Sequence, residues 1–90
     1  MSGSYEGPVR VLGGDGILLT TGTARIEPDP EMGTWRGIVQ TLIGTAVAGK
    51  ALVVEIETPE GIRGRAQLTP DSTDGDRALS KVTGFGPSPF

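Results

Sequence analysis

Residues 50–68 read KALVVEIETPEGIRGRAQL, and this stretch decides the fold. Apolar residues alternate with charged or polar ones on both sides of Pro59–Gly61, which is the period of a β-strand. A three-residue loop at Pro59–Gly61 closes them into a hairpin, with Gly61 in the left-handed conformation. That loop pairs residues of matching character: Glu57 with Arg63, Glu55 with Arg65, Leu52 with Leu68, and Val54 with Ala66. A slip of one residue would break both sets, so this register is predicted, with the ion pairs on the exposed face.

A second hairpin is predicted upstream, around the Gly13–Gly16 cluster. A loop at Gly14–Gly16 joins the strand-like runs 9–12 and 17–27, with Gly16 supplying the positive φ. This register places Val11 opposite Leu19 and Gly13 opposite Ile17. The apolar parity then changes along the second run, from odd positions at Ile17 and Leu19 to even ones at Ala24 and Ile26. Gly22 lies between the two sets, so we expect a bulge or kink there.

The remaining segments complete an all-β protein. Two further strands are expected at Trp35–Leu42 and Ala78–Thr83, with loops at the proline-containing segments Glu27–Gly33 and Pro70–Asp76. Residues 43–49 fit either a helical turn or a loop, and residues 1–7 are expected to form a flexible tail. About six short strands with close turns predict a small antiparallel six-stranded barrel or sandwich, as a single domain over residues 1–90.

Composition excludes several classes of function. The 90 residues contain no cysteine and no histidine, which excludes disulfides, thiolate sites and histidine-based acid–base catalysis. The net charge is −3 and the 8 basic residues are dispersed, so no nucleic-acid partner is expected. The longest uncharged stretch, residues 37–49, is too short and polar to span a membrane. The first residues do not resemble a signal peptide, so a cytoplasmic protein is expected.

The polar clusters are better explained by structural roles than by catalysis or ligand binding. Asp71, Asp74 and Asp76 resemble a calcium loop but have the wrong spacing and no closing glutamate, so a solvated turn and no metal are expected. Glu55 and Glu57 resemble a glycosidase pair, but the facing arginines favour structural ion pairs. The Gly13–Gly16 cluster precedes a strand instead of a phosphate-binding helix. Ser80 and Lys81 are adjacent in a strand and so point to opposite faces. We therefore expect no catalytic residues, no cofactor and no enzyme activity.

The aromatic residues are the remaining candidates for a role in binding. Trp35 and Phe85 are expected in the core. Phe90 follows Gly86-Pro87-Ser88-Pro89, a stiff segment that either tucks into the open end of the barrel or presents the ring to a partner. The candidate partner or ligand contacts are Trp35, Arg36, Phe85 and Phe90.

Three segments resemble a known family. They are the ending Val82–Phe90 (Val-Thr-Gly-Phe-Gly-Pro-Ser-Pro-Phe), the segment Tyr5–Pro8 (Tyr-Glu-Gly-Pro), and the segment Gly33–Gly37 (Gly-Thr-Trp-Arg-Gly). Together they are similar to an actinobacterial domain of unknown function, which occurs free-standing or appended to flavin-dependent monooxygenases. Members often carry a histidine where this chain has Thr34, and a tryptophan–glycine pair where it has Asp74-Gly75. A small-molecule site built from those groups would therefore be missing here.

The resemblance implies a non-catalytic β-barrel accessory or interaction module, working with a protein partner or by self-association into an oligomer. Two alternatives remain open. One is a small-ligand-binding barrel with Trp35 and Arg36 in its mouth. The other is a self-assembling structural subunit that uses a strand edge or the Phe90 segment.

Overall fold

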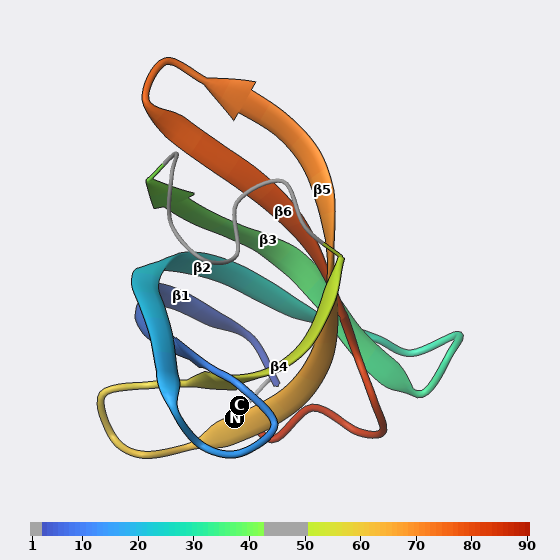
Figure 1. Cartoon of the computed structure of the whole chain (residues 1–90). Helices are drawn as coiled ribbons and strands as arrows, with labels where there is room; N and C mark the ends of the chain where they lie inside the picture. Colours follow the sequence, from blue (N-terminus) through green and yellow to red (C-terminus); the bar gives the residue numbers. More distant parts are fainter. Residues whose placement is uncertain (1–2, 43–50) are drawn as a thin grey trace.

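Six antiparallel strands form one closed sheet in the computed structural model, which describes residues 3–42 and 51–90 (Figure 1). The described residues contain no helix. The strands are β1 (Tyr5–Leu12), β2 (Leu18–Asp29), β3 (Thr34–Leu42), β4 (Leu52–Glu57), β5 (Arg63–Asp74) and β6 (Arg77–Gly84). The all-β, six-stranded prediction is confirmed, and the sheet closes as a barrel. The undecided segment 43–49 lies outside the described residues.

The barrel consists of two three-stranded meanders, β1–β2–β3 and β4–β5–β6, which meet at two boundaries. At one boundary β3 pairs with β6 over seven residues, from Arg36 to Leu42. At the other, β1 pairs with β4 over only three residues, Arg10–Leu12. In the described chain, the first half of β1 therefore has a strand neighbour on one side only, because Tyr5–Val9 pair with β2 alone. A gap in the strand ladder remains between β1 and the β4–β5 turn.

The β4–β5 hairpin has the predicted register. Glu57 pairs with Arg63, Glu55 with Arg65, Val54 with Ala66, and Leu52 with Leu68. Gly61 has a φ of 90°, and its N–H donates to the Thr58 carbonyl over 2.9 Å. The loop chemistry and the alternation of side chains thus select the same pairing.

The β1–β2 hairpin confirms the loop but corrects the pairing beyond it. The Gly13 N–H donates to the Ile17 carbonyl over 2.8 Å, and Gly16 has a φ of 83°, both as expected. Val11, however, pairs with Thr20, since the register shifts between Val11 and Leu12. The bulge therefore lies at Leu19, not at Gly22. Gly22 instead pairs in register, and its missing side chain leaves room for the Gln40 carbonyl of β3.

Three strands extend beyond a predicted end by two residues or more. β2 continues through Pro28, β5 continues through Pro70 to Asp74, and β1 already begins at Tyr5, where a flexible tail was expected. Both prolines lie where their strand has a neighbour on one side only. The β1–β2 pairing starts at Ile26, before Pro28, and the β4–β5 pairing ends at Leu68, before Pro70. A proline is tolerated at such an edge because its missing N–H leaves no ladder bond unmade.

The inside of the barrel is filled by side chains. Trp35 is completely buried, and Phe90 retains only 6% of its exposure. Phe85 was expected in the core, but it is 51% exposed, which overturns that expectation. The parity of β6 explains the error: Val82 and Gly84 face inward, so the next residue leaves the core. Around Trp35 and Phe90 pack the buried apolar residues Val9, Val11, Ala24, Ile26, Val39, Val54, Ile56, Ala66, Leu68 and Val82.

Candidate functional site

The most distinctive local arrangement is an aromatic ring held between two others. The Phe90 ring lies with its centroid 5.1 Å from that of Trp35, at an interplanar angle of 83°. Its centroid is 6.1 Å from that of Tyr5, with the planes tilted by 32°. We call the space between Tyr5, Trp35 and Gly64 the Phe90 slot. A cavity lined by Ser4, Tyr5, Thr58, Glu60 and Ile62 opens beside the ring, so the slot lies at the gap between β1 and the β4–β5 turn.

Two glycines create the room for Trp35. A Cβ atom on Gly64 would lie 2.7 Å from Cζ2 of Trp35 and 3.1 Å from Cε2 of Phe90. A Cβ atom on Gly84 would collide with the indole at Nε1 and Cδ1. The sequence reasoning missed this contact. The available signal was glycine at inward positions of two alternating strands, where an apolar side chain is the usual occupant.

The segment that carries Phe90 is tied to the barrel by a few hydrogen bonds. The Ser88 hydroxyl donates to the Gly3 carbonyl over 2.7 Å, and the Phe90 N–H donates to the Ser88 hydroxyl over 3.3 Å. Upstream, the Phe85 N–H donates to the Arg65 carbonyl over 3.0 Å. Gly3, close to the start of the chain, and Ser88, close to its end, consequently lie side by side. Of the two placements expected for Phe90, the structure has the ring inside its own barrel.

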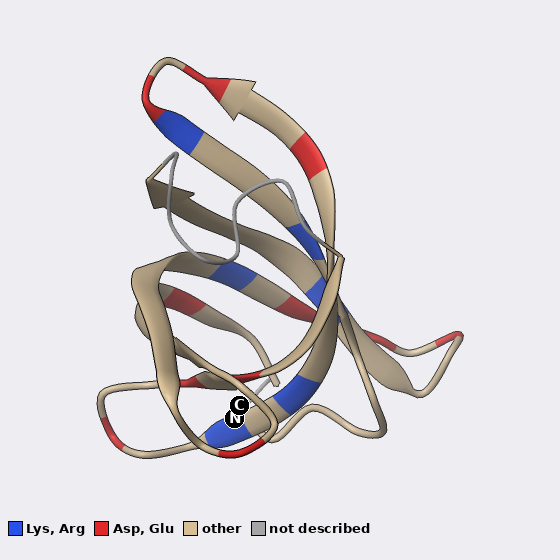
Figure 2. Cartoon of the chain, in the orientation of Figure 1, with Lys and Arg blue, Asp and Glu red and all other residues tan. Residues whose placement is uncertain are grey.

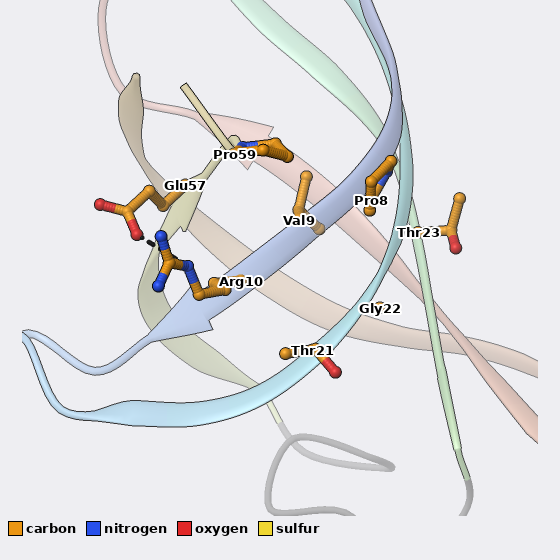
Figure 3. Close-up of a pocket in the computed structure, with 8 residues that line it drawn as sticks. All are labelled: Pro8, Val9, Arg10, Thr21, Gly22, Thr23, Glu57 and Pro59. Atoms are coloured by element: carbon orange, nitrogen blue, oxygen red, sulfur yellow. Dashed lines mark ion pairs between the residues drawn. The ribbon is translucent and has the colours of Figure 1, made fainter. Parts of the chain in front are cut away.

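The buried carboxylate of Glu57 joins β1, β4 and β5 at the short β1–β4 boundary. Glu57 on β4 pairs with Arg10 of β1 (Nε–Oε1, 3.0 Å) and with Arg63 of β5 (Nε–Oε2, 2.6 Å). Its side chain is only 8% exposed, whereas an exposed pair was expected. The Arg10–Glu57 pair lies beside a surface groove of about 470 Å³. The other residues that line this groove are Pro8, Val9, Thr21, Gly22, Thr23 and Pro59 (Figure 3).

The ion pairs of Glu57 favour its charged form. The hydrogen bond from Arg63 lowers the pKa of Glu57 below its ordinary value, and the charges of Arg10 and Arg63 act in the same direction. Burial raises the pKa but does not outweigh them. The same hydrogen bond raises the pKa of Arg63. The arrangement is thus a structural clamp on an ionised carboxylate, not a proton donor.

We expect the Glu57→Gln variant to unfold at a lower urea concentration than the wild type at neutral pH. Because the folded-state pKa lies below the ordinary value of 4.5, the stabilisation is complete above that value and is lost as the pH falls through the folded-state pKa. The difference between the two proteins should therefore shrink in urea titrations from about pH 7 down to about pH 3. Glu55→Gln is the matched control on the same strand. A difference that stays constant with pH would contradict the clamp.

The four candidate contact residues separate into an inner and an outer pair. Trp35 and Phe90 lie together inside the barrel and are not accessible. Arg36 lies on the outer face of β3, where its Nε is 3.5 Å from Oε1 of Glu27. It pairs in register with Thr83, two residues before the exposed Phe85. Arg36 and Phe85 are therefore the two members that a partner can reach.

The polar clusters of the sequence are distributed through strands and turns. Asp71 and Asp74 belong to β5, and Asp76 lies in the following turn. No group of three metal-ligating side chains occurs within residues 3–42 and 51–90. Ser80 is buried and Lys81 is exposed, so they face opposite ways, as strand geometry requires. Basic and acidic residues are interspersed over the barrel (Figure 2).

Calcium binding by the three aspartates remains a prediction with a negative expected result. Adding calcium at about 1 mM should leave the melting temperature unchanged, since the three aspartates have the wrong spacing for a calcium loop, lack a closing glutamate, and do not gather into a ligand cluster within the described residues. Differential scanning fluorimetry with magnesium as the control measures this. A calcium-specific rise that disappears in Asp74→Asn would contradict it.

These features define a six-stranded β-barrel with an aromatic core plug and an arginine–glutamate clamp. The described residues hold no helix capable of crossing a membrane. Comparison with protein-family models, curated proteins and solved structures finds no match for the chain.

Proposed function

We propose that this chain is a non-catalytic interaction module that binds another protein through the outer face around Arg36 and Phe85. The observation that carries the proposal is the division of the aromatics. Trp35 and Phe90 fill the barrel, whereas Phe85 is 51% exposed at the end of β6. Phe85 lies two residues after Thr83, the in-register partner of Arg36, and exposed aromatic and arginine side chains are enriched at the energetic centres of protein interfaces.

The family resemblance suggests the partner, a flavin-dependent monooxygenase. The charges favour a protein over a nucleic acid, because basic and acidic residues are interspersed along the described strands (Figure 2). The cytoplasm is the compartment we propose, since the cysteine-free chain needs no oxidising environment. The competing function, a carrier of small ligands, is less favoured because Trp35 and Phe90 occupy the inside of the barrel.

The experiment is a binding assay with immobilised barrel and flavin-dependent monooxygenases from the same organism. We expect Phe85→Ser and Arg36→Ser each to weaken binding by about tenfold or more, as for central interface residues. Ile17→Ser is the matched control, because Ile17 is also exposed (63%) but lies on the β1–β2 turn. Equal binding by all variants, or binding to none of the monooxygenases, would overturn the proposal. A thermal shift caused by small flavin-like or aromatic ligands alone would favour the carrier.

A further inference from the structure

The Phe90 slot has the properties of a binding site whose occupant happens to belong to the same chain. An aromatic ring enters it at the end of an extended, proline-containing segment and packs between Tyr5 and Trp35. Gly64 clears the wall behind the ring. We propose that this slot also accepts the Phe90 ring of a second copy, so that two barrels exchange their segments Gly86–Phe90. The proposal is independent of the monooxygenase partner.

The segment is held in a way that permits release. Its hydrogen bonds to the described part of the chain are the Ser88–Gly3 bond and the local Phe90–Ser88 bond. Pro87 and Pro89 have no N–H to donate, so they add no backbone donors to these bonds. The ring itself supplies most of the attachment, and an identical ring from another copy makes the same contacts. Exchange therefore preserves the contacts of the Phe90 ring with Tyr5 and Trp35. It changes only the path of the chain that leads to the ring.

A hinge lies where the segment leaves β6. Gly84 ends β6, and Gly86 has a φ of 80°, a conformation that glycine adopts without strain. Between them the Phe85 side chain is 51% exposed, so its ring does not hold the segment on the barrel.

The length of the segment fixes the geometry of the dimer. Five extended residues reach about 17 Å at 3.3–3.6 Å each. The smallest extent of the barrel is 20 Å, so the segment cannot pass around a neighbouring barrel. It reaches the slot of a second copy only when the two slots face each other. The expected assembly is a two-fold dimer in which each copy gives one ring and receives one.

The chain lacks cysteine, which makes a cross-linking test direct. An ideal Cβ atom on Gly3 lies 3.4 Å from Cβ of Ser88, close to the separation in a disulfide. Gly3→Cys and Ser88→Cys are made in separate chains, one of them carrying a size tag, and are mixed and oxidised. A covalent heterodimer that depends on Phe90 forms only if the segment of one copy lies on the barrel of the other. We expect this product, and we expect it to disappear when Phe90→Ala is added to the Ser88→Cys chain.

Two controls separate exchange from collision and from a strained variant. Ile17→Cys replaces Gly3→Cys as an exposed site away from the slot, and it should yield no Phe90-dependent heterodimer. Sedimentation of the unmodified chain should show a dimer fraction that grows with concentration and is absent in Phe90→Ala. The proposal is overturned if the double-cysteine chain closes on itself, the mixed single variants give no heterodimer, and the unmodified chain remains monomeric. A heterodimer that persists in Phe90→Ala would equally overturn it.

Discussion

Replacing Trp35 with alanine is expected to lower the free energy of unfolding by about 3–5 kcal/mol, the usual range for a large buried aromatic residue. Trp35 is completely buried, and its indole fills the space left by Gly64 and Gly84. Those glycines have no side chains with which to close the cavity. A domain of this size has a total stability of about 5–15 kcal/mol, so the substitution should remove a large part of that stability and shift the urea midpoint clearly downward.

Urea denaturation followed by circular dichroism measures the effect, because the substitution removes the single tryptophan that fluorescence would report. Trp35→Phe is the informative companion. The Trp35 Nε1 has no hydrogen-bond partner within residues 3–42 and 51–90, so phenylalanine loses packing but none of the hydrogen bonds of this part of the chain. It should cost less than alanine. Met32→Ala, at a side chain that is 73% exposed, should leave stability nearly unchanged. A Trp35→Ala variant within about 1 kcal/mol of the wild type would refute the central role of the ring.

The β4–β5 hairpin was predictable because two independent signals agree. The loop at Pro59–Gly61 selects one register, and the alternation of charged and apolar residues selects the same one. The prediction did not extend to the burial of Glu57. That burial depends on Arg10, which reaches Glu57 from β1 only after the barrel closes. The alternation within the β4–β5 hairpin cannot predict a contact with β1, because that contact forms where the barrel closes.

The strand ends were mispredicted because a proline was taken to end a strand. Pro28 and Pro70 are instead accommodated at positions where one edge of the strand has no partner. Which edge is free depends on strand order, and the sequence pattern alone does not establish it. The displaced bulge has a similar origin. A parity change shows that a bulge exists somewhere between Leu19 and Ala24, but the pairing with β1 sets its place.

The aromatic site shows most clearly what sequence patterns can miss. Phe85 and Phe90 both follow glycine or proline residues. The alternation of β6, in which Val82 and Gly84 face inward, places Phe85 outside the core, and no comparable pattern places Phe90. The complementarity between Trp35 and the two glycines joins three strands that are distant in sequence. It is a property of the closed barrel, and it leads to the second large prediction.

Replacing Gly84 with valine is expected to cost about 3 kcal/mol or more, at the upper end of the range for overpacked cores. The β6 backbone at Gly84 is fixed by its pairing with Ala66, so it cannot retreat from the indole. A Cβ atom there would meet Nε1 and Cδ1 of Trp35, and two further methyl groups would add to the collision. Trp35 cannot move away either, because Phe90 packs against it at 5.1 Å.

The cause can be separated from a general intolerance of β6 to substitution. Thr83→Val changes the neighbouring, outward-facing residue and should have little effect on the urea midpoint. Gly84→Ala should be clearly destabilising in the wild type but less so together with Trp35→Phe, since the smaller ring vacates the space that the methyl group needs. This double-mutant cycle should give a coupling energy of about 1 kcal/mol or more. Additive effects of the two substitutions would mean that a side chain at Gly84 does not destabilise the protein through the Trp35 indole. The packing of Trp35 would then not be the reason for glycine at this position.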